Sequence, residues 1–541
     1  MKLWKLPFFG KRRKNSGGGA GAQGDTHRNS GSRNASARLS ADIASNVRWI
    51  QSALGESGDV VVRTIDDAAP GMEGIAFVYI DDLVDQLTVN QMLLHPIMAE
   101  MGGQSSPTSP NEWFRILKNR VLAVGQVDEI QTLDEALTSM LEGSTLIFLQ
   151  GCPVAMSAGT SGGDKRSVEE PSSQTVIRGP KESFTETIKT NVSLLRRRIK
   201  SPDLRVEKKQ LGKQTKTQIV LVYLKGIAKD SIVQEMHARL DRIDTDSILE
   251  SGYIEEFIQD AAVSPFPTIE NTERPDAAAA GILEGQIAVI VDGTPFVLLA
   301  PVSFVRFFQS SEDFYQRYDI ATFLRLIRYV AFFVSTLLPS LFIAITTYHQ
   351  EMLPTPLLIS LAAQREGVPF PAIVEGLLME ITFEVLREAG VRMPRVIGPA
   401  ISIVGALVLG QAAVQAGLVS AAMVIVVSFT AIANFVIPAI NMAIAARLIR
   451  FGMMILAGTL GLFGIMSGMM VILIHLAGLR SFGVPYLAPL SPFVWTNWKD
   501  TFVRAPMWAM KKRPPTMVGK NNPVRQGQDQ MPKPPGRNSK S

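Results

Sequence analysis

The stretch "IRYVAFFVSTLLPSLFIAITTY" (residues 327–348) divides the chain into two parts with different chemistry. A helix needs roughly 20 consecutive, mainly apolar residues to cross a membrane, and this stretch is long enough. Charged and apolar residues are mixed before it, whereas the chain after it stays mostly apolar as far as residue 476. We therefore predict a soluble region followed by a membrane domain. The average composition, 46% hydrophobic and 19% charged, hides this division.

Three further segments are predicted to span the membrane: residues 396–417, 418–440 and 452–479. Residues 357–395 are ambiguous, because "QREG" and a row of glutamates interrupt their apolar pieces. A full crossing, a re-entrant pair and an interfacial helix all remain open. Arginines just before residue 329 place the soluble region on the cytoplasmic side. The basic C-terminal tail would lie outside if residues 357–395 cross, and inside if they do not.

The soluble region alternates predicted strands and helices, which indicates an α/β fold. "DVVVRTI" and "GIAFVYI" predict strands, and "TLDEALTSMLEG" predicts a helix that Thr132 opens and Gly143 closes. After a Gly/Ser-rich linker, "TQIVLVYLKGIA" predicts a strand and "DSIVQEMHARLDRI" a helix of a second subdomain. In "GQIAVIVDGTPFVLLAP" (residues 285–301) the turn signal "DGTP" favours a β-hairpin over a membrane helix.

The predicted fold class is therefore an α/β N-terminal region of two subdomains followed by an α-helical, polytopic membrane domain. A short apolar run followed by a basic cluster opens the chain, an order that does not match a signal peptide. The expected segments are a disordered Gly/Ser/Arg leader (1–37), the first subdomain (38–155), a linker (156–176), the second subdomain with its C-terminal hairpin (177–304), an interfacial amphipathic helix (305–326), the membrane domain (327–479) and a basic, Pro-rich tail (480–541).

A row of carboxylates is the first candidate functional feature. "LMEITFEVLREAGVRMP" (residues 378–394) places Glu380, Glu384 and Glu388 on one face of a predicted helix. Like charges four residues apart repel each other, and Arg387 and Arg392 are spaced to offset part of that repulsion. One interpretation is a salt-bridged interfacial helix. The other is that a ring of subunits turns the row into rings of carboxylate, which attract and select cations.

Two other patterns lie in the apolar region. Small residues recur at every fourth position: Gly398, Ser402, Ala406 and Gly410. Such a row lets helices pack closely in lipid, either for packing alone or to line a narrow pore in an oligomer. The second pattern combines two amides with a proline: Asn434, Pro438 and Asn441. It predicts either a kink with satisfied amides or a gating site, because proline removes a backbone hydrogen bond.

The sequence contains none of the motifs that would indicate an enzyme. It has no P-loop, no GxGxxG after a strand, no HExxH, no GxSxG and no paired-cysteine metal site, so we expect no catalytic residues, metal or cofactor. A net charge of +5 over 541 residues only weakly indicates nucleic acid binding. The basic residues cluster beside apolar segments, which favours membrane lipid as the partner. The single cysteine, Cys152, excludes an intrachain disulfide.

Residues 40–492 closely resemble the A subunits of GerA-type spore germination receptors. The stretches that carry the resemblance are "GPKESFTETIKTNVSLLRRRIKSPDL", "PFPTIENTERPD", "LEGQIAVIVDGTPFVL", "ISLAAQREGVPFPAIVEGLLMEITFEVLREAGVRMP" and "IGPAISIVGALVLGQAAVQAGLVSAAMVIVV". The resemblance implies a subunit of a nutrient receptor in the inner membrane of a bacterial endospore, with its N-terminal region on the core side. It also implies a transporter-like B subunit and a C-subunit lipoprotein as partners, and oligomerisation of the A subunit.

Three functional hypotheses follow from these features and from the resemblance. The first is a ligand-gated subunit that helps to form an ion-conducting path and has no enzymatic activity. The second is a non-conducting scaffold or transducer of the same receptor. The third is a secondary transporter, which usually needs more spans and an internal repeat; the membrane region shows neither.

Overall fold

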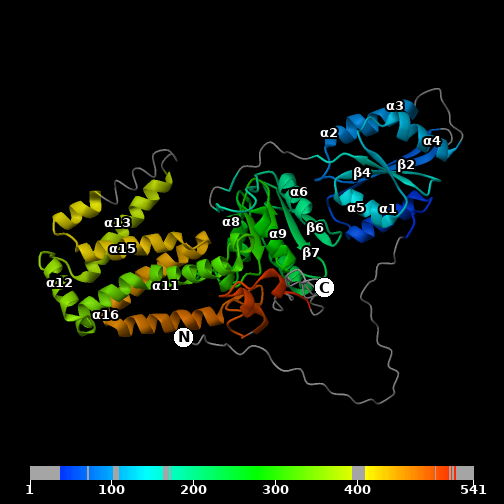
Figure 1. Cartoon of the computed structure of the whole chain (residues 1–541). Coiled ribbons are helices and arrows are strands. Elements are labelled where there is room, and N and C mark those ends of the chain that lie inside the picture. Colours follow the sequence, from blue (N-terminus) through cyan, green and yellow to red (C-terminus); the bar gives the residue numbers. More distant parts are fainter. Residues whose placement is uncertain are drawn as a thin grey trace, which may run out of the picture.

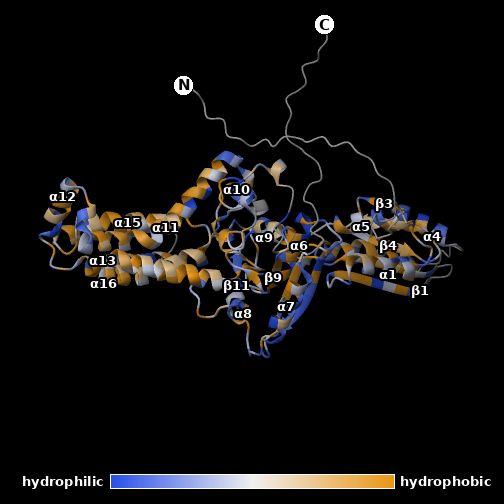
Figure 2. Ribbon diagram, turned by 90° about the horizontal axis from the view of Figure 1, so that it is seen from below, coloured by the Kyte–Doolittle hydropathy of each residue, from blue (hydrophilic) through white to orange (hydrophobic). Residues whose placement is uncertain are grey.

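The computed structural model describes residues 37–69, 72–101, 109–162, 170–171, 174–392, 408–493, 495–510, 513 and 517–519. Two α/β subdomains and a helical bundle follow one another along the molecule (Figure 1). Hydrophobic residues dominate much of α11, α15 and α16 in the bundle, whereas the two subdomains carry a mixed surface (Figure 2).

The first subdomain is a five-stranded antiparallel sheet in the order β1-β2-β4-β5-β3, with helices on both faces. Its strands are β1 (Val60–Ala69), β2 (Met72–Ile80), β3 (Val127–Ile130), β4 (Ser144–Leu149) and β5 (Ala155–Gly159). Its helical segments are α1 (Ile43–Leu54), α2 (Gln86–Thr88), η1 (Val89–Leu94), α3 (His95–Met101), α4 (Pro110–Ile116), η2 (Leu117–Val121) and α5 (Leu133–Leu141). Strand side chains alternate between faces, so Phe77 packs with the α3 and α4 layer and Val78 with α1 and α5.

The second subdomain repeats this topology. Its strands lie in the order β6-β7-β9-β10-β8, which is the arrangement of the first sheet. They are β6 (Leu204–Leu211), β7 (Thr217–Leu224), β8 (Glu270–Thr272), β9 (Ile287–Val291) and β10 (Val297–Ala300). The helices are α6 (Ile188–Arg198) and α9 (Pro275–Leu283) on one face and α7 (Asp230–Asp241) and α8 (Ser251–Ile258) on the other. Residues 285–301 hold the antiparallel pair β9 and β10, in place of a helix.

One predicted boundary differs from the structure. Strand β5 runs to Gly159 and so continues past residue 155, where the first subdomain was expected to end. The reason is pairing: β5 lies between β3 and β4 and hydrogen-bonds to both. Its small residues suit a strand that is covered on both faces, although the sequence pattern alone resembles a linker.

A buried ion pair joins the two subdomains. Arg196 of α6 reaches Asp59, which precedes β1, with Nε–Oδ2 at 2.8 Å and Nη2–Oδ1 at 3.0 Å. Both side chains are fully buried, and Ser57 accepts a further hydrogen bond from Arg196 at 2.9 Å. A bidentate arginine–carboxylate pair fixes orientation as well as distance, so this contact holds one subdomain against the other.

Residues 305–326 do not form the single interfacial helix that the sequence predicts. They contain most of η3 (Phe304–Phe308), all of α10 (Glu312–Tyr315) and the first residues of α11 (Tyr318–Tyr348). The chain turns at Arg317, whose backbone is extended. This turn brings Asp313 back to Arg325 and Arg328, at 3.2 and 2.7 Å. A continuous helix would separate residues 313 and 325 by about 18 Å, so these ion pairs require the break.

The bundle and the C-terminal segment complete the fold. Their helical segments are α11, η4 (Gln350–Met352), α12 (Thr355–Arg365), α13 (Ala372–Arg392), α15 (Ala421–Phe435), α16 (Ile440–Gly478), η5 (Trp495–Asp500) and η6 (Met507–Ala509), and the two short strands are β11 (Arg480–Ser481) and β12 (Val484–Pro485). Of the described helices, α11 and α16 are long and apolar enough to cross a membrane. The predicted span 418–440 is shorter, because α15 ends at Phe435 before Pro438. Most of residues 396–417 lies outside the described residues.

Helix α16 is two antiparallel arms joined at Gly461, not the single span 452–479. Gly461 has φ 62° and ψ −140°, which is not helical. A methyl group at Gly464 would lie 2.1 Å from the carbonyl oxygen of Leu456, although residues eight apart in a straight helix are separated by about 12 Å. At the other end, the chain on both sides of α16 returns to the second subdomain: His475 lies 2.8 Å from Ser264.

This reversal places the C-terminal segment beside the α/β subdomains. Phe482 and Val484 pack into the core of the second subdomain, and Val518 pairs with Ala228. The segment from residue 480 to 510 is therefore packed against the fold, whereas the sequence indicated only a basic tail. Residues 520–541 lie outside the described part of the chain.

Replacing Gly461 with alanine tests the reversal. A side chain is strained at this φ and ψ, so we expect Gly461→Ala to lower the free energy of unfolding by about 1–3 kcal/mol. Gly452→Ala is the matched control, because Gly452 lies in the same helix with open space around it; it should be neutral or stabilising by up to about 1 kcal/mol. Thermal unfolding of the detergent-purified chain measures both. Equal effects would contradict a reversal at Gly461.

The buried carboxyl of Asp82 predicts a pH dependence of stability. Burial, together with the charge of Asp59, raises the pKa of Asp82 from 3.8 to about 7. Between these values the folded chain holds a proton that the unfolded chain has lost. Stability should therefore fall as pH rises through this window, by about 1.4 kcal/mol per pH unit at most. Asp82→Asn should flatten the profile between pH 5 and pH 8, and Asp128→Asn, at an exposed position, should leave it unchanged.

Candidate functional site

Helix α13 carries the predicted row of carboxylates into the bundle. It contacts α11, α15 and α16. Its first half is buried at Ala372 and Gly376, and a methyl group at Gly376 would press on Met454, Ile343 and Met423. The small residue therefore allows close packing at this crossing. The position of α13 decides which glutamates face protein and which face outward.

Glu380 forms a buried ion pair with Arg450 of α16. Glu380 Oε2 lies 2.9 Å from Arg450 Nη2, and the two side chains are only 1% and 2% exposed. Among the described residues, Glu380 Oε1 and Arg450 Nε have no hydrogen-bond partner. Removing charges from water is expensive, and an ion pair recovers that cost only with good geometry and further hydrogen bonds. This pair is therefore strongly held but incompletely satisfied.

Glu384 lies one turn further along α13 and is partly exposed. Its carboxylate contacts Arg447 at 3.1 Å and Arg450 at 3.4 Å, and it also pairs with Arg387 of its own helix. Arg450 thus bridges Glu380 and Glu384. We call these four residues, Glu380, Glu384, Arg447 and Arg450, the charge cluster.

Glu388 stands apart from the charge cluster. It pairs with Arg392 at 2.6 Å, and both side chains are largely exposed. The three glutamates therefore share a helical face but not an environment, which changes from buried at Glu380 to exposed at Glu388. The pairings of Arg387 and Arg392 that their spacing predicts are both present.

Glu375 is a further buried carboxylate of α13, which the sequence analysis did not single out. It is fully buried, and its Oε1 accepts hydrogen bonds from the backbone N–H of Ser420, at 2.5 Å, and from the Ser420 hydroxyl. Arg365 of α12 lies 3.9 Å from its other oxygen. Since Ser420 also caps α15 by accepting from Met423 N–H, Glu375 ties α13 to the start of α15.

The other candidate residues divide between packing contacts and undescribed positions. Gly398, Ser402 and Ala406 lie outside the described residues, and Gly410 is buried against α15. Asn434 is buried and accepts a hydrogen bond from Ser335 of α11 at 3.2 Å.

Pro438 lies in the break between α15 and α16. Asn441, just after the break, donates to Glu255 of α8 at 3.5 Å. The two amides thus have partners on different elements, and they contact the junction between the bundle and the second subdomain.

The sequence analysis also missed Arg447 and Arg450 as partners of the glutamates, using them only to assign orientation. A signal was available. Two arginines three residues apart in an apolar run are costly and require acidic partners, and the nearest apolar segment rich in carboxylates is residues 375–388. What the sequence could not supply is the register of α13 against α16.

Within the described residues, no group of three or more His, Cys, Asp or Glu side chains is positioned to hold a metal ion. The arrangement of the charge cluster suits the holding and exchange of charged partners between helices.

Comparison with known proteins links the chain to a family. The family model described as "Bacillus/Clostridium GerA spore germination protein" matches residues 48–516. Spore germination protein KA of Bacillus subtilis (strain 168) is 48% identical over 92% of this chain and 90% of that protein. GerLA of Bacillus cereus is 36% identical over 90% of this chain and 98% of that protein. The crystal structure of the N-terminal domain of the A subunit of the Bacillus megaterium germinant receptor GerK3 is 35% identical, covers 50% of this chain and 98% of that one, and has a TM-score of 0.37.

A double-mutant cycle tests the buried pair. Glu380→Leu or Arg450→Met alone leaves one charge buried without its partner, so each should lower the free energy of unfolding by about 3–5 kcal/mol. The double variant should lose much less than the sum, because no isolated charge remains. Glu388→Leu, in the exposed pair, should change stability by about 0.5 kcal/mol or less. Additive losses in the double variant would show that Glu380 and Arg450 do not interact.

Proposed function

This chain belongs to the GerA family of spore germination proteins, and we propose that it acts as an A-type subunit of a germinant receptor and contributes to a gated ion-conducting path. Its relatives are spore germination proteins of the same extent, and membership of the family implies association with the spore membrane. The receptor role and the conducting path go further and are argued below.

The observation that carries the ion path is the charge cluster. Four ionised side chains lie together between helices that are otherwise apolar. Such residues are costly in a membrane and are commonly found where charged species pass or bind. The free Oε1 of Glu380 adds an acceptor that no described residue satisfies. We infer that Glu380 and Glu384 face a cation route when Arg447 and Arg450 move away from them.

A gating step follows from the shared arginine. Arg450 pairs with both Glu380 and Glu384, so a shift of α16 relative to α13 changes the charge presented by both glutamates. Asn441, on the same helix, touches Glu255 of the second subdomain. Movement of that subdomain would reach the charge cluster through α16. In this proposal, several A subunits assemble around the path, with a transporter-like B subunit and a C-subunit lipoprotein as the other members of the receptor.

The second candidate is a non-conducting transducer of the same receptor. It is favoured by the pairing itself, because Glu380, Glu384 and Glu388 all find arginine partners within one chain. In this case the charge cluster is a latch between α13 and α16 and no cation passes it. Both candidates place the α/β subdomains and the C-terminal segment on one side of the membrane, which we assign to the spore core.

Potassium release from spores distinguishes the two candidates. We expect Glu384→Gln to slow nutrient-triggered release severalfold, because it leaves Arg447 as an unopposed positive charge beside the cation route. Glu384 is preferable to Glu380 for this test because it is partly exposed, so its loss should cost less stability. Glu388→Gln is the control from the exposed end of the same face. Receptor abundance is measured in each strain, and normal release with Glu384→Gln at normal abundance would favour the transducer.

A further inference from the structure

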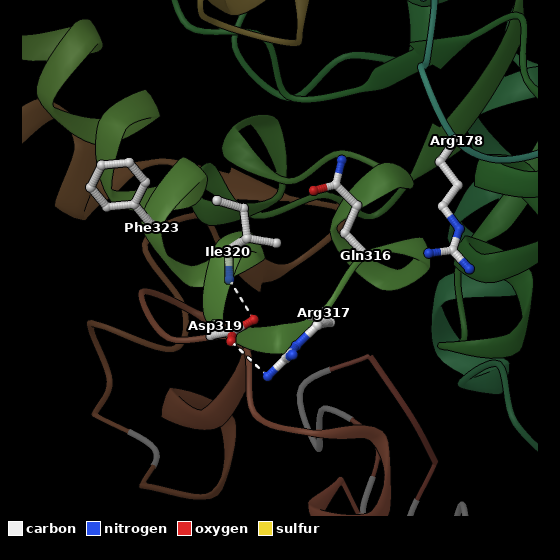
Figure 3. Close-up of a pocket in the computed structure, with 6 residues that line it drawn as sticks. All are labelled: Arg178, Gln316, Arg317, Asp319, Ile320 and Phe323. Carbon is white, nitrogen blue, oxygen red and sulfur yellow. Dashed lines mark hydrogen bonds and ion pairs between the residues drawn. The ribbon is translucent and has the colours of Figure 1, made fainter.

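A surface pocket lies where the second subdomain meets the start of α11. Its volume is about 560 Å³, and it is lined by Arg178, Gln316, Arg317, Asp319, Ile320 and Phe323 (Figure 3). Arg178 comes from the segment before α6, and the other residues come from the end of α10 and the first turns of α11. The pocket thus joins a soluble subdomain to the base of a candidate membrane span.

The polar part of the pocket is cationic. The guanidinium groups of Arg178 and Arg317 are both exposed, against one carboxylate, that of Asp319. Asp319 pairs with Arg317 at 3.0 Å, but both side chains are more than half exposed, so water weakens the pair. Among the described residues, Arg178 has no ion-pair partner. An incoming anion would therefore meet one arginine that is free of described partners and a second that is held only loosely.

The other part of the pocket is apolar and continues along α11. Ile320, Phe323, Ile327 and Val330 follow helical spacing on one face, with exposed fractions of 43%, 59%, 38% and 61%. Arg325 and Arg328 lie on the other face and are buried against Asp313. The apolar face therefore starts at the pocket and runs into the candidate span without cover from any described residue.

We propose that this pocket binds the headgroup of an anionic phospholipid, with the acyl chains along the exposed face of α11. A guanidinium can hold a phosphate through two parallel hydrogen bonds, and basic residues at a membrane surface attract anionic lipid. A headgroup phosphate between Arg178 and Arg317 would also bridge the second subdomain to α11. The apolar face beside the two arginines points to a lipid, because a free phosphate has nothing to place there.

This proposal needs the chain to lie in a membrane but does not need ion conduction. The lipid site could be present in a conducting receptor or in a transducer. Lipid binding is also measured on purified protein, so failure of the lipid site and failure of the ion path would be seen in separate experiments.

The test measures phosphatidylglycerol binding to the full-length chain. The detergent-purified protein is titrated with phosphatidylglycerol or phosphatidylcholine, and bound lipid is counted by native mass spectrometry. We expect tighter binding of phosphatidylglycerol, and a loss of affinity of about fivefold for each arginine removed in Arg178→Gln and Arg317→Gln. Replacing both with lysine should recover part of the affinity, since lysine keeps the charge but not the paired hydrogen bonds.

The control removes two exposed arginines from the first subdomain, Arg115→Gln and Arg120→Gln, and should leave binding unchanged. Unchanged phosphatidylglycerol binding in the Arg178/Arg317 double variant would overturn the proposal. Equal losses for phosphatidylcholine would also overturn it, because the headgroup charge would then be irrelevant. Inorganic phosphate alone is titrated in parallel. If it competes with the lipid at comparable concentration and with the same dependence on the arginines, the pocket is an anion site and not a lipid site.

Discussion

The fold depends on Arg325, which is completely buried at the base of the bundle. Its guanidinium contacts Asp313 of α10 at 3.2 Å and Asp500 of the C-terminal segment at 2.9 Å, and it donates to the Asp500 carbonyl at 2.6 Å. Arg328 adds a second cation to Asp313. A buried charge is tolerated only when it is paired and hydrogen-bonded. Three segments, distant in sequence, must therefore meet here before α11 can leave the second subdomain.

From this junction, the bundle extends and returns. The reversal at Gly461 turns a 39-residue helix into two arms, so the chain comes back to the second subdomain and the C-terminal segment packs there. The charge cluster lies on the arm of α16 that leaves the junction, facing α13. A displacement at the junction is thus connected by one helix to the ion pairs, and the junction and the charge cluster belong to one mechanical unit.

The two subdomains carry a lesson about repeated structure. They share a strand order and a three-layer arrangement, yet no repeat is evident in the sequence. The alternation of apolar residues defines each strand, whereas strand order depends on which edges pair after collapse. Different residues satisfy the same layers, because a core requires apolar volume and periodicity more than particular side chains.

The sequence by itself determined the local and chemical features: two regions of α/β pattern, the apolar helices, the hairpin signal at "DGTP", the capping of α5 by Thr132, the shared face of Glu380, Glu384 and Glu388, and the family. These depend on spacing and turn residues within a few positions. Only the tertiary structure decided the partners of those glutamates, the turn at Arg317, the reversal at Gly461 and the side on which the C-terminal segment lies. The physical reason is range: the Arg450–Glu384 contact joins residues 66 positions apart, and such a contact depends on how whole helices pack, which no local pattern encodes.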